Sequence, residues 1–164
     1  MELPVLSFMQ GYQIEHFGEF DEEKLRRRLK ELEPICSGRP VVIDTETTGL
    51  HIRYDKLSAI GVGWGPYVFT MLYTPLHGNV LREFIEEHVR HVIFFNAKFD
   101  MHFLERFCGI KWFDLYRRRG LKIEDVMGYV RIVLQDEDET AKLKYLAKKY
   151  IHPRANFYEK VLKT

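Results

Sequence analysis

Apolar residues along the chain fall into two spacings, and short continuous runs of them predict strands in four places. The runs cover residues 41–46, 57–63, 67–73 and 91–95, and together they are rich in β-branched and aromatic residues. Glycine and proline at 63–66 mark a tight turn between the second and third runs. Because strands joined by short connections usually pair with each other, we expect the first three runs to form an antiparallel meander.

Apolar residues at helical spacing predict helices before and between these strands. The first helix starts at an N-cap, Asp21, where Phe20 and Leu25 occupy the positions of a hydrophobic staple. Pro34 is expected to end it, because proline interrupts the backbone hydrogen bonds of a helix. A second helix, before the fourth strand, is expected to start at Asn79.

The second half of the chain reads mainly as helices separated by loops. A helix follows the strand at 91–95 and stops at Gly109, and a loop with a basic cluster covers 114–120. Residues 123–134 are expected to form another helix, for which Asp125 is an N-cap rather than a metal ligand. Thr140 is expected to cap the helix after it.

The order of these elements predicts an α/β fold with a mixed sheet, in which an antiparallel meander is joined by parallel strands and flanked by helices. A length of 164 residues suits one domain. We expect an N-terminal arm and helix over 1–37, and the main domain over 38–164.

Composition narrows the class of protein without identifying its chemistry. The net charge is +1, so a nucleic-acid surface would have to be local. Cys36 and Cys108 form neither a disulfide framework nor a metal-ligand spacing. Residues 1–10 lack the pattern of a signal peptide, and no stretch approaches the length of a membrane span. We therefore expect a cytoplasmic protein without a membrane partner.

Two carboxylates, Asp44 and Glu46, stand at the end of the first predicted strand. Residues i and i+2 of a strand point to the same face, so both acids project from one side. Like charges held this close repel, and a hard cation such as Mg²⁺ or Mn²⁺ would relieve the repulsion. The alternative is an exposed edge strand, but the apolar run 41–43 favours a strand covered on both faces. Gly49 allows a sharp turn or a close approach to a ligand.

A third carboxylate, Asp100, lies in the helix that follows the strand at 91–95. It is one residue, or about 100° of helical rotation, from the apolar stripe that begins at Phe99, so it sits at the margin of the core. A carboxylate there needs a partner, and a metal ion would serve. The alternative is an ordinary exposed helical aspartate.

These motifs resemble a known family. Asp44-Thr45-Glu46 followed by Asn96-x-x-x-Asp100 is similar to the first two motifs of the DEDD 3′–5′ exonuclease superfamily, which has a ribonuclease-H-like fold. The similarity is closest to the proofreading exonuclease domain of family A DNA polymerases. The segments at 125–127 and 143–150 resemble its later helices, so the resemblance covers residues 38–151.

The resemblance implies a two-metal hydrolysis of DNA phosphodiester bonds from a single-stranded 3′ end. Asp44, Glu46 and Asp100 would be the catalytic carboxylates and would hold two Mg²⁺ or Mn²⁺ ions. A polymerase domain or a separate polymerase chain is the implied partner. The implied substrate-binding residues, whose alternatives are turn and core positions, are Thr47, Leu50, Asn96 and Phe99.

One feature of the family is missing from the sequence. A fourth acidic residue belongs to a Tyr-x-x-x-Asp or His-x-x-x-Asp motif, and no tyrosine or histidine here precedes an aspartate at that spacing. We expect the motif beyond Thr164, which would make the domain C-terminally incomplete and would impair hydrolysis by this chain, or a substitute at Glu159 or 136–139. Two alternatives remain: a non-catalytic nucleic-acid-binding or polymerase-associated module, and an RNA-trimming exonuclease of the same superfamily.

Overall fold

A computed structural model of the chain describes residues 11–134, 142–153 and 155. They form two compact units, Gln13–Asp125 and a second that holds 11–12 together with the described part from Val126 onwards. The predicted boundary after residue 37 does not coincide with this division. The reason is that the first strand and the first helix pack with the rest of the first unit.

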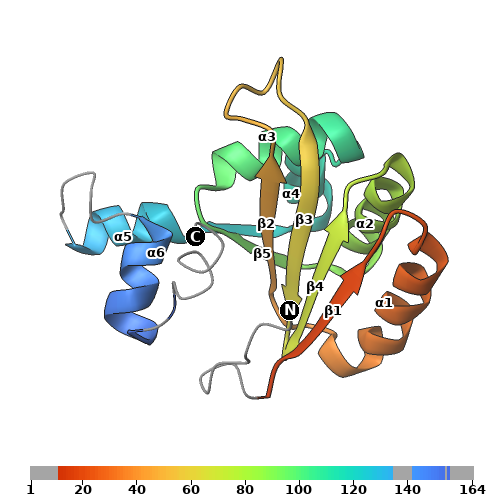
Figure 1. The fold of residues 1–164 in the computed structure, drawn as a ribbon, viewed down its shortest axis with the longest axis horizontal. Helices are drawn as coiled ribbons and strands as arrows, with labels where there is room; N and C mark the ends of the chain where they lie inside the picture. Colours follow the sequence, from red (N-terminus) through yellow and green to blue (C-terminus); the bar gives the residue numbers. More distant parts are fainter. Residues whose placement is uncertain (1–10, 135–141, 154, 156–164) are drawn as a thin grey trace, which may run out of the picture. The chain divides into compact units, whose positions relative to one another are not determined.

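The first unit is built on one six-stranded sheet with the strand order β1-β4-β3-β2-β5-β6 (Figure 1). Strands β2, β3 and β4 form the predicted antiparallel meander, while β1 pairs with β4, β5 with β2 and β6 with β5 in parallel. The predicted fold class, an α/β mixed sheet with flanking helices, is therefore confirmed. The strands are β1 Gln13–Phe17, β2 Val41–Thr47, β3 Leu57–Trp64, β4 Tyr67–Leu72, β5 His91–Phe94 and β6 Lys122–Asp125.

Three helices of the first unit pack side by side, α1 against α2 and α2 against α3. They are α1 Glu22–Cys36, α2 Pro75–His88 and α3 Ala97–Cys108. In the central strand β2, alternate residues Val41, Ile43 and Thr45 are buried, whereas the residues between them are exposed. The prediction that this strand is covered on both faces is wrong, because Val42 remains 48% exposed.

The ends of α1 differ from their prediction. The Asp21 carboxylate accepts a hydrogen bond from the Gly18 backbone N–H at 2.8 Å and makes none to the helix. Phe20 is 94% exposed, so it forms no staple with the buried Leu25. The helix continues through Pro34 to Cys36, so this proline does not end it.

The start of α2 also lies elsewhere than predicted. Thr74 is its N-cap, and its hydroxyl oxygen accepts a hydrogen bond from the His77 N–H at 3.1 Å. Asn79 lies inside the helix. Proline at the first helical position, Pro75, fits this start because its missing N–H needs no partner there. By contrast, α3 ends as predicted at Gly109, whose φ of 74° favours glycine.

The segment predicted as a basic loop is a helix, α4 Trp112–Arg119. Trp112 and Leu115 are buried, and the Trp112 ring meets Phe94 at 5.5 Å between centroids. The Trp112 indole N–H also donates to the Met101 carbonyl at 3.1 Å, which fixes α4 to α3. The arginines at 117–119 occupy its last turn, where cations are favourable.

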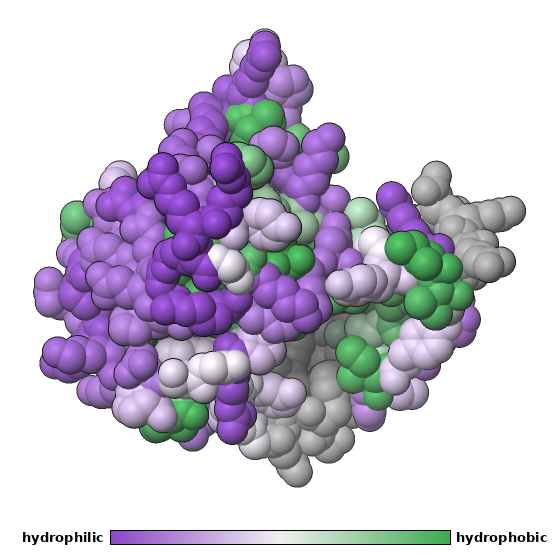
Figure 2. All heavy atoms as spheres, turned by 180° about the vertical axis from the view of Figure 1, so that it is seen from behind, coloured by the Kyte–Doolittle hydropathy of each residue, from purple (hydrophilic) through white to green (hydrophobic). Residues whose placement is uncertain are grey.

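The second unit contains α5 Val126–Leu134, α6 Leu143–Leu146 and a π-helix at Ala147–Ile151. The helix predicted over 123–134 therefore begins later, because residues 122–125 belong to β6. Its described helices expose many apolar side chains, which appear as green groups in Figure 2. Thr140 lies outside the described residues. No helix in the described part of the chain is long and apolar enough to cross a membrane.

Candidate active site

Asp44 and Glu46 lie on the exposed face of β2, on either side of the buried Thr45. Partial burial raises the pKa of Asp44, and the neighbouring Glu46 carboxylate raises it further. Opposite Asp44 in the next strand is Gly61, where an added Cβ would meet only the Asp44 carbonyl, at 3.8 Å. The face of the sheet beside Asp44 is therefore free of a cross-strand side chain at this position.

Asp100 reaches β2 because β5 ends early. Parallel pairing of β2 with β5 covers only Val41 and Val42, after which the chain leaves β5 and enters α3. Asp100, in the first turn of α3, fills this gap at the edge of β2. Its Oδ1 accepts hydrogen bonds from the Thr45 backbone N–H at 2.9 Å and from the Thr45 hydroxyl at 2.6 Å. The Thr45 N–H at the edge of β2 is thus hydrogen bonded to the Asp100 carboxylate rather than to a neighbouring strand.

The environment of Asp100 favours its protonated form. The residue is 3% exposed, and burial raises the pKa of its carboxyl to about 6. The Thr45 hydroxyl partly offsets this effect by donating to the carboxylate, whereas the nearby charge of Asp44 adds to it. Two carboxyl groups with raised pKa values therefore lie within electrostatic reach of each other.

The donor chemistry of the three carboxylates fits a hard divalent cation, since oxygen ligands are what such ions prefer and a cation would relieve the repulsion. In the structure, however, these three carboxylates do not stand close enough together to form a complete metal site. Within the described chain, no three histidine, cysteine or acidic side chains stand close enough to hold a metal ion. The metal-binding role of Asp44, Glu46 and Asp100 therefore stays a prediction.

A pocket of about 270 Å³ opens beside α3. Three of the predicted substrate residues, Leu50, Asn96 and Phe99, line it together with Ile52, Lys98, His102 and Phe103. Thr47 is not among the lining residues; its hydroxyl donates to the Gly49 carbonyl at 2.7 Å and shapes the turn. Lys98 and His102 were not predicted here, although their i, i+4 spacing places them on one edge of α3.

The loop after β2 presents Leu50, which is 86% exposed. The Asp55 carboxylate organises this loop by accepting from the His51 N–H at 2.7 Å and from the Thr48 hydroxyl at 3.2 Å. Gly49 leaves room for this carboxylate, because a Cβ there would lie 2.6 Å from the Asp55 oxygens and would force them to move. The loop is tied to α3 by Arg106, whose guanidinium donates to the backbone carbonyls of Ile52 and Asp55.

Asp125 does not act as the N-cap predicted for the helix after it. It is the last residue of β6, and its two carboxylate oxygens accept from the backbone N–H groups of Asn96, at 2.9 Å, and Ala97, at 3.1 Å. The residue therefore caps α3, the helix that carries Asp100. The predicted substitutes for a fourth carboxylate, Glu159 and 136–139, lie outside the described residues.

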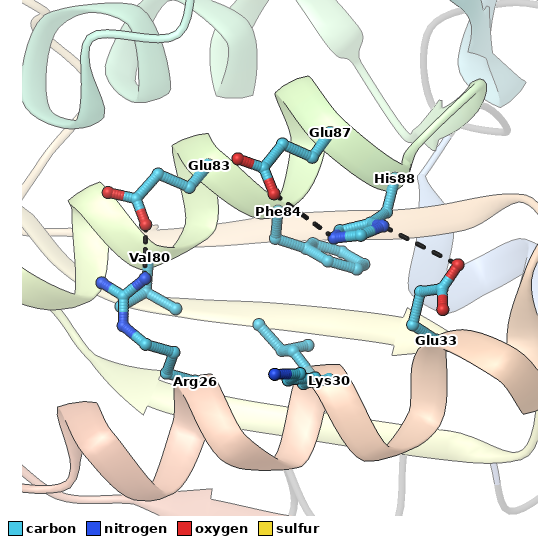
Figure 3. A pocket seen from close by; sticks show the side chains of 9 residues that line it. Arg26, Lys30, Glu33, Val80, Glu83, Phe84, Glu87 and His88 are labelled. Carbon is cyan, nitrogen blue, oxygen red and sulfur yellow. Dashed lines mark hydrogen bonds and ion pairs between the residues drawn. The ribbon is translucent and has the colours of Figure 1, made fainter.

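A larger pocket, of about 440 Å³, lies between α1 and α2 and contains no residue of β2 or α3. Several of its polar and charged groups are paired with one another (Figure 3). Arg26 bonds to Glu83, and the two His88 ring nitrogens lie 3.8 Å and 3.5 Å from carboxylate oxygens of Glu33 and Glu87. Size alone therefore does not mark a functional site, and the carboxylates with the pocket beside α3 remain the candidate site.

Comparison with known proteins identifies the family of this chain. The family model described as 3′-5′ exonuclease covers residues 15–163. The chain belongs to the 3′-5′ exonuclease family. This match confirms the resemblance to 3′–5′ exonucleases predicted from the sequence.

Relatives extend the comparison to whole proteins and to solved structures. A DNA polymerase of Escherichia phage T5 is 29% identical over 115 residues, which are 68% of this chain; the chain spans only 13% of that polymerase. The RNase domain of yeast Pop2 matches with a TM-score of 0.66 at 12% identity, covering 96% of this chain and 82% of that domain. Brucella melitensis NrnC with bound Mg²⁺ matches with a TM-score of 0.55 at 15% identity, covering 85% and 61%. At these identities the two structures show a shared fold.

The raised pKa of Asp100 predicts how the metal-free protein responds to pH. Its pKa in the folded protein, about 6, is above the ordinary 3.8, so the stability it contributes is greatest below pH 4 and is lost as the pH rises through 6. Asp100→Asn keeps an acceptor oxygen for Thr45 and removes the charge. We expect it to raise the free energy of unfolding at pH 8 by roughly 1–3 kcal/mol, and much less at pH 4.

Urea unfolding in a chelating buffer at both pH values measures this difference. Asp114→Asn, which changes an exposed carboxylate of α4, should bring no comparable gain at pH 8. An equal gain for Asp100→Asn at pH 4 and pH 8 would show that burial of the charge is not its cause.

The Arg106 contacts predict that this side chain orders the loop that holds Leu50. Hydrogen bonds from a charged donor contribute about 1.5–3 kcal/mol each, so Arg106→Ala should increase amide hydrogen exchange across 48–56 by about tenfold or more. Arg27→Ala, which removes an exposed arginine of α1, is the matched control and should leave this loop unchanged. Unchanged protection of 48–56 in Arg106→Ala would mean that Asp55 alone holds the loop.

Proposed function

We propose that this chain provides a 3′–5′ exonuclease that removes nucleotides from single-stranded DNA ends with two divalent cations, Mg²⁺ or Mn²⁺. The observation that carries the proposal is the junction of α3 with β2. There the Asp100 carboxylate bonds to Thr45, between Asp44 and Glu46, while the same helix lines the pocket that contains Asn96 and Phe99.

Asp44, Glu46 and Asp100 would hold the cations. Bound there, the ions would supply an activated water and stabilise the leaving 3′ oxygen during in-line attack on the phosphodiester. Asp44 would serve both ions, because it is electrostatically coupled to each of the other two carboxylates: the Glu46 charge raises the pKa of Asp44, and the Asp44 charge raises the pKa of Asp100. Without cations the three carboxylates would repel a phosphate group, which makes binding of an anionic substrate dependent on the metal.

The pocket beside α3 would receive the terminal nucleotide. Leu50 and Phe99 offer apolar surface to a base, and the Asn96 amide can hydrogen bond to the sugar or phosphate. Lys98 adds a positive charge for phosphate at the same wall. Thr47 would act only through its backbone and the turn that it shapes, since its hydroxyl bonds to Gly49.

A second candidate is digestion of RNA by the same site. The RNase domain of yeast Pop2 shares the fold over nearly the whole of this chain, and the pocket contains no described feature that would exclude a 2′-hydroxyl. The match to the T5 polymerase favours DNA and a polymerase partner, either as a domain or as a separate chain. A non-catalytic nucleic-acid-binding module is the outcome if neither substrate is digested.

Metal binding can be tested apart from activity. A ligand that binds only the native state stabilises it, so Mn²⁺ or Mg²⁺ should raise the melting temperature of the wild type by several degrees. Asp44→Ala should abolish that shift because it removes the ligand shared by both ions, whereas the exposed Asp114→Ala should retain it. Equal shifts in wild type and Asp44→Ala would place the cation elsewhere.

The activity itself is tested with 5′-labelled single strands of DNA and RNA. We expect stepwise shortening from the 3′ end that stops when EDTA removes the metal, and a rate reduced about 10²-fold or more in Asp44→Ala. DNA strands should be digested faster than RNA strands of the same sequence. Asp44→Ala digesting as fast as the wild type would assign the activity to another site or a contaminating nuclease.

A further inference from the structure

The carboxylate of Asp125, at the end of β6, holds the turn that joins β5 to α3. Parallel pairing aligns Asp125 of β6 with Phe94, the last residue of β5. From this position each carboxylate oxygen accepts one backbone N–H of the turn that follows β5, from Asn96 at 2.9 Å and from Ala97 at 3.1 Å. The negative charge also lies where the helix dipole of α3 favours it.

The turn held by Asp125 has an unusual backbone. Asn96 has φ 72° and ψ 57°, and it is the one non-glycine residue of the described chain with a positive φ. A side chain with a Cβ is strained in this left-handed region, although asparagine tolerates it better than most residues. Such strain persists only where surrounding contacts impose it, and the two bonds to Asp125 are contacts of that kind.

Asn96 occupies the N-cap position of α3, yet its side chain makes no capping hydrogen bond. Asparagine at this position usually caps its own helix. Here Asp125 supplies the cap from a neighbouring strand, and the Asn96 side chain lines the pocket beside α3 instead. Because Asp125 caps the helix, the Asn96 side-chain amide can bind a ligand in the pocket.

We propose that Asp125 is a positioning residue of the exonuclease site, which holds the turn between β5 and α3 so that Asn96 faces the terminal nucleotide. This inference rests on the proposed function. Asp125 acts through Asn96, and it contacts neither the substrate nor the cations. If Asp125 only stabilised the fold, its replacement would weaken substrate binding by the same factor with and without the Asn96 side chain.

The test is a double-mutant cycle between Asp125→Asn and Asn96→Gly. The quantity measured for each variant is the KM for a single-stranded oligonucleotide. Asp125→Asn has nearly the volume of the wild type but turns an NH₂ group toward one backbone N–H. We expect it to raise KM about tenfold with a smaller change in kcat. Asn96→Gly removes both the pocket amide and the backbone strain, so adding Asp125→Asn to it should change KM by less than about twofold.

Glu124→Ala is the matched control, because Glu124 lies on the same strand and pairs with His91 and Lys122 outside the turn. It should leave KM unchanged. A full tenfold effect of Asp125→Asn in the Asn96→Gly background would overturn the inference and leave Asp125 a structural cap. So would an Asp125→Asn variant with a wild-type KM.

A measurement that needs no activity keeps the two proposals apart. In the metal-free protein, Asp125→Asn and Asp125→Ala should increase hydrogen exchange of the Asn96 and Ala97 amides about tenfold, while Glu124→Ala should not. Unchanged exchange in both Asp125 variants overturns the positioning role. Wild-type protein that digests neither DNA nor RNA overturns the proposed function instead, whatever the amides show.

Discussion

A carboxylate almost completely removed from water must find hydrogen-bond donors, and Asp100 finds both of its donors in Thr45. That requirement is met only because β5 pairs with β2 over two residues and then gives way to a helix. A longer β5 would occupy the edge of β2 and exclude α3 from it. The early end of one strand thus brings an acidic helix residue next to two acidic strand residues.

The same arrangement includes two energetically unfavourable features, and both lie at the candidate site. Burial and the charge of Asp44 make the ionised form of Asp100 unfavourable, and the turn before α3 holds Asn96 in a strained conformation. A packed apolar core could avoid both features, but it could not bind a cation or a nucleotide. The structure compensates with specific contacts, of which Thr45 and Asp125 are the clearest, and with a well-buried core on the helical face of the sheet.

Local signals explain which parts of the chain sequence reasoning could predict. The meander follows from short apolar runs and a Gly-Pro turn, and the common face of Asp44 and Glu46 follows from the period of a strand. Asp100 could be placed at the margin of the core from the apolar stripe of α3 alone. The motifs then led to the family, which the match over residues 15–163 confirms.

Three of the errors share a physical cause, since each depends on a partner distant in sequence. Val42 is exposed because the helices pack on the other face, which an apolar triplet cannot reveal. Residues 122–125 become a strand because β5 offers an edge, although the helical pattern that follows suggested an earlier start for α5. Asp125 looked like a cap for the next helix, yet it caps one that begins 28 residues earlier along the chain. Asparagine and aspartate are both capping residues, and only the tertiary structure decides which of them serves α3.

The pocket beside α3 finally bears on how such a site would select its substrate. Most of its wall is apolar, from Leu50, Ile52, Phe99 and Phe103, and its polar groups come from α3 and its N-cap residue. Every base offers a face for stacking, so an apolar wall accepts all of them, whereas reading a base edge would need several fixed donors and acceptors. An enzyme with this pocket would recognise the end of a strand more than its sequence. That property suits an exonuclease, which must remove whichever nucleotide comes next.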